Sequence, residues 1–171
     1  MQNKYYYLVA SLPSLQLDGD VLMSSRVFLT ECKKWLTSED MDTLLAVNIK
    51  CAHGECDRTP LLAAWKEFDD ALRGELALAR EARKKNEEFR ESDRIHHIIS
   101  QETPLLSEQE IARMRWDFLE GMAHAYYFDL SWLIIYYLEL QIVERLATFN
   151  KDKGEKYFYE LCEVDYEKAI G

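Results

Sequence analysis

Apolar residues recur at intervals of three and four along most of the chain, which is the spacing of one face of an α-helix. The longest such stripe follows Pro60 and consists of Trp65, Phe68, Leu72, Leu76, Ala79 and Arg83. Only three prolines and six glycines interrupt the 171 residues, and no sustained alternation of apolar and polar residues indicates a sheet. The pattern therefore predicts an all-α protein.

One predicted helix, residues 131–149 ("SWLIIYYLELQIVERLATF"), is apolar on nearly every side. Such a helix is expected at the centre of a bundle. Asp129 or Ser131 could cap its N-terminus, because both side chains accept hydrogen bonds from backbone N–H groups. Its continuous apolar run, residues 131–138, is much shorter than the roughly 20 residues of a membrane span. We therefore expect a buried helix and no membrane crossing.

The pattern in the N-terminal third of the chain predicts shorter helices and one possible strand. Residues 5–12 ("YYYLVASL") fit a strand or a first helix, since aromatic and β-branched residues favour strands. Residues 21–36 have approximately helical spacing. Thr37 followed by Asp40 forms a helix start, flanked by Leu36 and Met41 as a hydrophobic staple, and we expect a helix from there to about residue 47.

Two further helix starts are predicted. Thr59 is an N-cap followed by a proline at the first helical position. Ser107 and Glu110 match a capping box, with Leu106 and Ile111 as the staple. A solvated stretch ends the first of these helices, and a polar connection covers residues 92–106.

A last short amphipathic helix is expected within residues 155–170, after Lys151, Lys153 and Gly154 end the apolar one. Residues 1–171 are thus expected to form a single helical domain. Its architecture would be a bundle of long amphipathic helices around one nearly all-apolar central helix.

The charge balance narrows the possible partners. The chain carries 31 acidic and 21 basic residues, a formal net charge of −10. Phosphate backbones require clustered Lys and Arg, so nucleic-acid binding is disfavoured. The first 15 residues lack the apolar length of a signal peptide, and the four cysteines are therefore expected as reduced thiols in the cytoplasm.

The stretch "CAHGEC" places Cys51, His53 and Cys56 within six positions. A structural zinc site needs four Cys or His ligands, usually as two close pairs, and no second pair has comparable spacing. Cys32, Cys162 and the pair His96–His97 could complete a site only if the fold brought them there. A thioredoxin-like role would require CxxC beside strands, so we interpret the segment as a polar loop and predict no metal or cofactor.

Nothing else in the sequence indicates catalysis. A di-iron bundle would need Glu-x-x-His motifs, and none is present. Glu139 and Glu144 lie on the most apolar helix, where a carboxylate needs a partner. We expect structural ion pairs to the arginines of this region, which are Arg113, Arg115 and Arg145.

Tyrosines are abundant, and seven of the ten occur in three groups at residues 5–7, 126–127 and 136–137. A tyrosine can bury its ring while its hydroxyl remains at a wet edge. Tyrosine is also enriched at protein–protein interfaces. These residues are therefore expected to form core and interaction surface, without catalytic residues.

Three segments together resemble a small bacterial protein family whose members are usually encoded beside V-type ATPase subunits. They are "YYYLVASLPSL", "PLLAAWKEFDDALRGELALAREARK" at residues 60–84, and "RMRWDFLEGMAHAYYFDLSWLIIYYLELQIVERLATFNKDKG" at residues 113–154. That family is similar to a shortened form of the C/d subunit of the ATPase, which is called d in eukaryotes. The chain departs from the family pattern at Gly74, where asparagine is expected, and it has about half the length of a full C/d subunit.

The resemblance implies a non-enzymatic, all-helical component of a rotary ATPase. In the full-length relatives, the C/d subunit sits on the cytoplasmic face of the membrane rotor ring and receives the central stalk. The implied partners are therefore rotor-ring and stalk subunits, and the implied location is the cytoplasm or the cytoplasmic face of the inner membrane. The alternatives from the residues themselves are a metal- or redox-dependent enzyme that uses Cys51, His53 and Cys56, or a free-standing helical adaptor.

Overall fold

The computed structural model describes residues 4–49, 59–86 and 92–149. Within these ranges the chain forms seven helices and no strand. They are α1 (Tyr6–Ser11), α2 (Ser25–Cys32), α3 (Ser38–Leu45), α4 (Pro60–Lys85), α5 (Asp93–Ile99), α6 (Pro104–Ala123) and α7 (Leu130–Ala147). The expected all-α bundle is confirmed, and the ambiguous N-terminal segment is helical.

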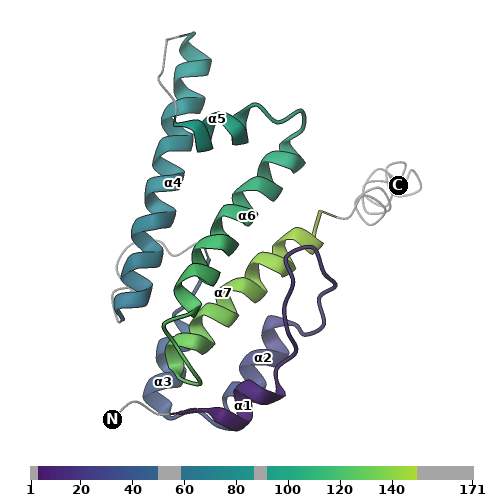
Figure 1. Ribbon diagram of the computed structural model, residues 1–171, viewed down its shortest axis with the longest axis vertical. Coiled ribbons are helices and arrows are strands. Elements are labelled where there is room, and N and C mark those ends of the chain that lie inside the picture. Colours follow the sequence, from purple (N-terminus) through teal and green to yellow (C-terminus); the bar gives the residue numbers. More distant parts are fainter. Residues whose placement is uncertain (1–3, 50–58, 87–91, 150–171) are drawn as a thin grey trace, which may run out of the picture.

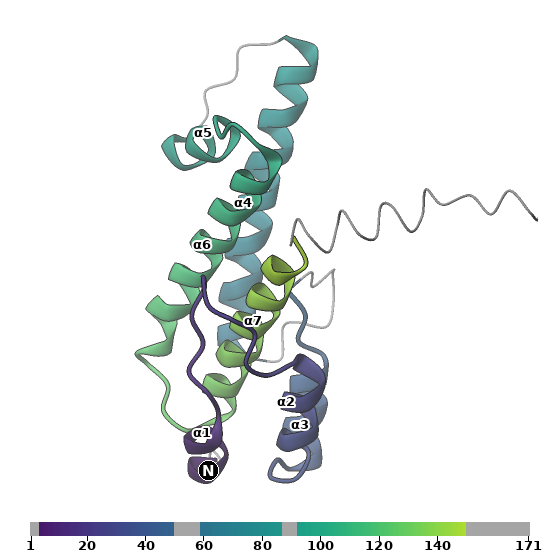
Figure 2. The same cartoon turned by 90° about the vertical axis from the view of Figure 1, so that its right-hand side faces the viewer.

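The antiparallel pair α6 and α7 forms the centre of the molecule (Figure 1). Ten of the 18 residues of α7 are buried, as its nearly uniform apolar sequence predicts. α2 and α3 pack against α7, whereas α4 and α5 pack against α6. α1 and the α2–α3 pair both lie at the lower end of the molecule (Figure 2).

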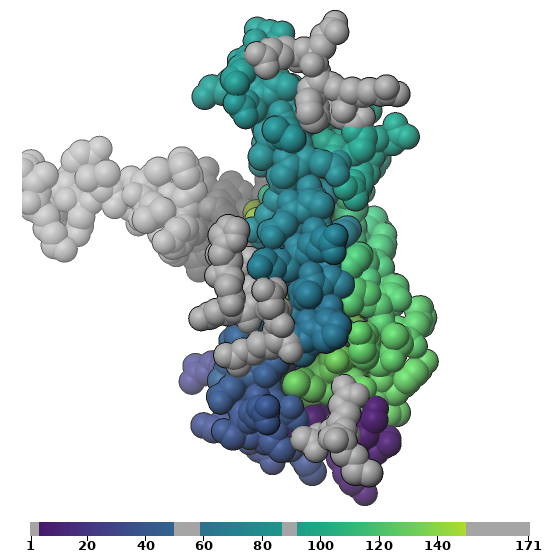
Figure 3. Space-filling model, turned by 90° about the vertical axis from the view of Figure 1, so that its left-hand side faces the viewer, coloured from purple at the N-terminus to yellow at the C-terminus, as the bar shows by residue number. Residues whose placement is uncertain are grey.

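α4 is the longest helix and forms one flank of the bundle (Figure 3). Its first half joins the main core through Leu61, Leu62 and Trp65. Its second half packs with α5 and the start of α6 in a separate small core that includes Leu76 and Ile95. The second half of α4 therefore packs mainly against α5 and α6.

Three predicted helix starts are confirmed by hydrogen bonds. The side chain of Thr37 accepts from the N–H of Asp40, and that of Thr59 accepts from the N–H of Leu62. Asp129, rather than Ser131, caps α7 by accepting from the N–H of Trp132. These caps are local interactions, which explains why the sequence alone reveals them.

The predicted start of α6 is wrong. The helix begins at Pro104, and Thr103 is its N-cap, accepting from the N–H of Leu106. The hydroxyl of Ser107 instead donates to the carbonyl of Ile98 at 2.8 Å. Ser107 therefore lies inside α6 and ties it to α5.

Two other expectations need correction. The polar connection at residues 92–106 contains α5, whose Ile95 and Ile98 are fully buried against α4 and α6. Arg83 does not continue the buried stripe of α4 but is exposed, and its guanidinium donates to the carbonyl of Ile99. The expected C-terminal helix at residues 155–170 lies outside the described residues.

The helix at residues 21–36 is shorter than its pattern predicts. α2 begins at Ser25, with Ser24 as its N-cap, and its last helical residue is Cys32. Gly74 lies on the exposed side of α4, and no atom lies within 4 Å of where a Cβ would stand. The departure from the resembling family at this position is thus not a packing requirement.

Candidate functional site

Five aromatic side chains gather on the outside of the molecule, at the end where α6 turns into α7. They are Tyr6 and Tyr7 on α1, Trp35 after α2, and Tyr127 and Phe128 in the link before α7, and we call them the aromatic surface. Their exposed fractions run from 37% for Phe128 to 80% for Tyr7. Exposed aromatic residues grouped in this way mark a surface suited to binding another protein.

α1 connects the two halves of the aromatic surface through ring contacts. The rings of Tyr6 and Phe128 have centroids 4.9 Å apart, and those of Tyr7 and Trp35 are stacked at 6.2 Å. Residues from three separate parts of the chain therefore meet only because the bundle folds.

Polar contacts hold this end of the bundle rigidly. Lys4 donates to the carbonyl of Tyr127 at 2.8 Å and pairs with the buried carboxylate of Asp129 at 3.0 Å. The backbone N–H of Tyr5 donates to the carbonyl of Phe128, and the hydroxyl of Tyr5 hydrogen-bonds to Asp40. The aromatic rings are thus presented on a fixed backbone, which reduces the entropy lost on docking.

Phe128 has a left-handed backbone conformation, with φ of 57°. This region is unfavourable for a bulky residue other than glycine. The surrounding contacts of Tyr5 and Lys4 stabilise it here, and strain of this kind is found where function requires a side chain in a particular place.

A groove of about 840 Å³ runs between α2 and α3, close to Trp35 in the sequence. Its apolar lining includes Leu29, Leu36, Met41 and Leu45. It is open to solvent, and with the aromatic surface it extends the apolar character of this part of the molecule.

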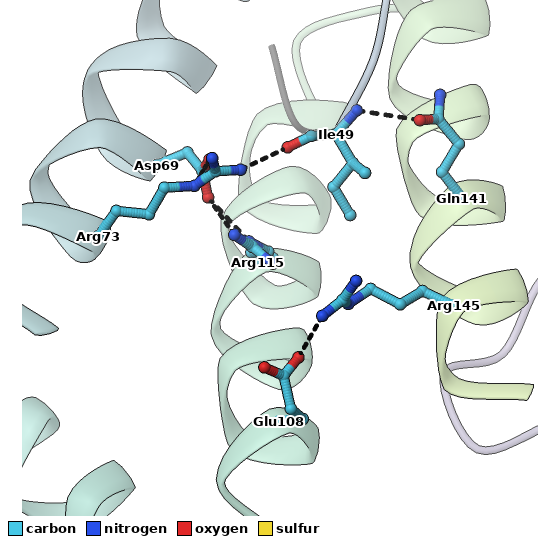
Figure 4. A network of polar contacts seen from close by, with 7 residues as sticks. All are labelled: Ile49, Asp69, Arg73, Glu108, Arg115, Gln141 and Arg145. Atoms are coloured by element: carbon cyan, nitrogen blue, oxygen red, sulfur yellow. Dashed lines mark hydrogen bonds and ion pairs between the residues drawn. The ribbon is translucent and has the colours of Figure 1, made fainter. Parts of the chain in front are cut away.

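A buried ion pair joins α4 to α6 (Figure 4). The carboxylate of Asp69, only 5% exposed, accepts hydrogen bonds from Nε and Nη2 of Arg115 at 2.8 and 2.6 Å. Nε of Arg73, one helical turn further along α4, lies 2.7 Å from the other carboxylate oxygen. One buried carboxylate thus pairs with two guanidinium groups.

The same network reaches the chain after α3 and continues to α7. Arg73 donates to the carbonyl of Ile49 at 3.0 Å, and the N–H of Ile49 donates to the side-chain oxygen of Gln141 at 2.9 Å. Arg145 of α7 pairs with Glu108 of α6 at 2.9 Å. Together these contacts fix the three longest helices to one another.

The second half of the chain matches a known family. Residues 78–165, just over half of the chain, match the model of a family described as "Protein of unknown function (DUF2764)". The chain belongs to this family. No curated protein and no solved structure matches it.

The matched DUF2764 segment contains α5, α6 and α7 and the end of α4. It therefore includes the central helix pair, the Arg145–Glu108 ion pair and the link that carries Tyr127 and Phe128. α1, α2 and α3 lie outside the match, so three of the five residues of the aromatic surface come from the part of this DUF2764 protein that precedes it.

In the described part of the chain, the candidate metal ligands from the sequence analysis do not form a cluster. Cys51, His53 and Cys56 lie outside the described residues. His96 and His97 are exposed on α5, and no group of three possible ligands occurs in the described ranges.

Cys32 belongs to the main core instead of a reactive site. It is fully buried, and burial raises the pKa of its thiol to about 12. A thiol that stays protonated is a poor nucleophile and a poor metal ligand. Its role in this chain is therefore packing.

The expected ion pairs of Glu139 and Glu144 with arginines are wrong. Glu144 accepts hydrogen bonds from the backbone N–H of Ser25, at 2.7 Å, and from its hydroxyl, so it positions the start of α2. Arg145 and Arg115 are paired with other carboxylates, and Arg113 lies 3.7 Å from Asp18. Long-range packing, which periodicity does not reveal, decides these partners.

Glu139 has no ion pair or hydrogen bond within the ranges that the structure describes. Burial, followed by the negative charge of Glu120, raises the pKa of Glu139 to about 8. Because the side chain is only partly buried, an isolated protonated carboxyl can remain in contact with water.

Glu139→Gln is expected to remove a pH dependence of stability. The folded-state pKa of Glu139 lies above its ordinary value of 4.5. The contribution of this residue to the stability of the folded wild type is therefore fully present below about pH 4.5 and is lost as the pH rises through 8. Glutamine mimics the protonated form, and the variant should therefore be more stable at pH 9 by about 1–3 kcal/mol, after allowance for solvent screening. Urea unfolding at pH 4.5 and pH 9 measures this.

Glu120→Gln provides the matched control for that experiment. This substitution removes the negative charge of Glu120 but leaves Glu139 as buried as before. It should therefore change the stability at pH 9 in the same direction as Glu139→Gln, but by less. Parallel curves of stability against pH for the wild type and Glu139→Gln would contradict the prediction.

Proposed function

We propose that the protein is a non-catalytic, C/d-like subunit associated with a V-type ATPase, which couples or assembles the central stalk on the membrane rotor ring. The observation that carries this proposal is the aromatic surface, a rigid and exposed group of rings at one end of a helical bundle. The partner is proposed from the sequence: three segments resemble a family that is encoded beside V-type ATPase subunits.

The mechanical properties of the bundle support a coupling role. A part that transmits torque must not deform, and close-packed interiors have low compressibility. α6 and α7 pack along their length, and the Asp69 network fixes α4 to both. Docking at the end of this body would transfer force along the helix axes.

The helices were also searched for a membrane span. No described helix has both the length and the apolar character to cross a bilayer. In our proposal the protein partners, the rotor ring and the central stalk, hold the protein at the cytoplasmic face.

Replacing two rings of the aromatic surface tests the proposal. The double variant Tyr7→Ala/Trp35→Ala removes two exposed aromatic side chains that stack on each other. An aromatic hot spot contributes about 2 kcal/mol or more, so the loss of even one of the two should weaken binding at least about thirtyfold. Affinity for purified ATPase rotor-ring and stalk subunits, measured by biolayer interferometry, is the readout.

Leu78→Ala is the matched control, because Leu78 is an equally exposed apolar residue on α4, away from the aromatic surface. It should bind like the wild type. The proposal fails if the wild-type protein binds neither the ring nor the stalk subunits, or if the double variant binds as tightly as the control.

A further inference from the structure

A pocket lined by arginines lies between α4, α6 and α7, in the middle of the molecule. Arg73 and Arg80 contribute from α4, Arg115 from α6 and Arg145 from α7, and Glu108 is the single acidic residue of the lining. We call it the arginine pocket. In Figure 4 the guanidinium groups of Arg73, Arg115 and Arg145 point into the space that the three helices enclose.

Positive charge exceeds negative charge in this pocket, although the chain as a whole has a net charge of −10. Asp69 balances Arg73 and Arg115 with one negative charge, and Glu108 balances Arg145. Arg80 has no carboxylate partner in the described part of the chain. Four guanidinium groups therefore face two carboxylates, an excess of two positive charges.

The guanidinium groups are held in place and still have hydrogen-bonding capacity. Arg73 uses two of its N–H groups and Arg115 uses two, whereas Arg145 uses one. A guanidinium has five N–H donors, so each of the three retains at least three without a partner among the described residues. Donors fixed in advance in this way lower the entropy cost of binding an anion.

The size and lining of the pocket define the class of ligand. Its volume of about 280 Å³ is just below the usual range for ligand sites, roughly 300–1,000 Å³, which indicates a small ligand. Leu76 and Ile111 add an apolar wall that lowers the local dielectric and strengthens charge-assisted hydrogen bonds. Guanidinium forks match the geometry of phosphate and carboxylate groups.

We propose that the arginine pocket binds a small polyanion, a molecule that carries at least two phosphate or carboxylate groups. Two negative charges would neutralise the excess that the paired carboxylates leave. The site is separate from the aromatic surface, because its lining comes from the first part of α6 and the last part of α7, whereas the aromatic surface includes the link between the end of α6 and the start of α7. Its existence therefore does not depend on the docking role proposed above.

Calorimetric titration of the full chain at low ionic strength tests the proposal. The probes are pyrophosphate, propane-1,2,3-tricarboxylate and inorganic phosphate. We expect saturable 1:1 binding of pyrophosphate or the tricarboxylate with Kd below about 1 mM, and at least about tenfold weaker binding of inorganic phosphate. The two polyanions distinguish a phosphate-bearing from a carboxylate-bearing ligand.

Arg80→Ala removes the guanidinium that has no partner in the described residues, and it should weaken binding of the preferred polyanion about ten- to hundredfold. Lys84→Ala, one turn further along α4 and outside the pocket, is the matched control and should bind like the wild type. Both side chains are exposed, so the thermal midpoints of the variants should equal that of the wild type.

Three results would overturn the proposal. The first is an absence of saturable binding for both polyanions. The second is equal loss of affinity in Arg80→Ala and Lys84→Ala, which would indicate diffuse attraction to the helix. The third is binding of inorganic phosphate as tightly as of either polyanion, which would exclude a requirement for two anionic groups.

Discussion

Asp69→Asn is expected to lower the free energy of unfolding by about 3–5 kcal/mol, the usual cost of removing one partner from a buried ion pair. The substitution leaves the guanidinium of Arg115 nearly buried, with a side chain only 11% exposed, and without its counter-charge. Urea unfolding followed by circular dichroism measures the loss. Arg73→Ala is the control, since its side chain is 42% exposed and should contribute less than about 1 kcal/mol.

A double substitution distinguishes the cost of leaving one buried charge unpaired from the cost of removing the ion pair as a whole. In Asp69→Leu/Arg115→Leu neither buried charge remains, and apolar replacements for a buried pair are often neutral or stabilising. The double variant should therefore recover most of the stability that Asp69→Asn loses. If it is as unstable as the single variant, packing at these positions matters more than charge pairing.

Trp65→Ala is expected to cost about 3–5 kcal/mol, the range for removing a large aromatic side chain from a core. Trp65 is 1% exposed and contacts Phe68 and Phe118, whose stacked rings have centroids 4.1 Å apart. Its removal would leave a cavity where α4 meets α6. The midpoint of urea unfolding measures the effect, and Trp65→Phe should lie between the wild type and Trp65→Ala.

Trp35→Ala is the internal control for that measurement. The same chemical change is made at a tryptophan that is 53% exposed, so the free energy of unfolding should change by no more than about 0.5 kcal/mol. Equal losses at the two positions would mean that Trp65 is not the packing centre that the structure shows.

Several features of the fold could be predicted because they depend on neighbouring residues. The caps of α3, α4 and α7 satisfy N–H groups three residues away, so the signal is contained within a few positions. The Thr103–Pro104 pair before α6 is the same signal as Thr59–Pro60 before α4. The sequence therefore contained the correct start of α6, but the capping-box pattern at Ser107 competed with it.

The buried ion pair also left a trace in the sequence that was not recognised. Asp69 stands four residues after Trp65 and three before Leu72, which is a core position of the apolar stripe. Arg115 stands four residues after Ile111 on the buried face of α6. Two opposite charges at core positions of two predicted helices indicate a buried pair, but only if the helices are known to be neighbours.

The sequence by itself determined the helical class, the central position of α7 and the starts of α3, α4 and α7, because periodicity and capping are local properties of the chain. Only the tertiary structure decided which carboxylate meets which arginine and which aromatic rings gather at one end. Asp69 and Arg115 are 46 residues apart in the chain, and Tyr6 and Phe128 are still more distant. Contacts of this kind depend on how the helices pack, and no short stretch of sequence records that arrangement.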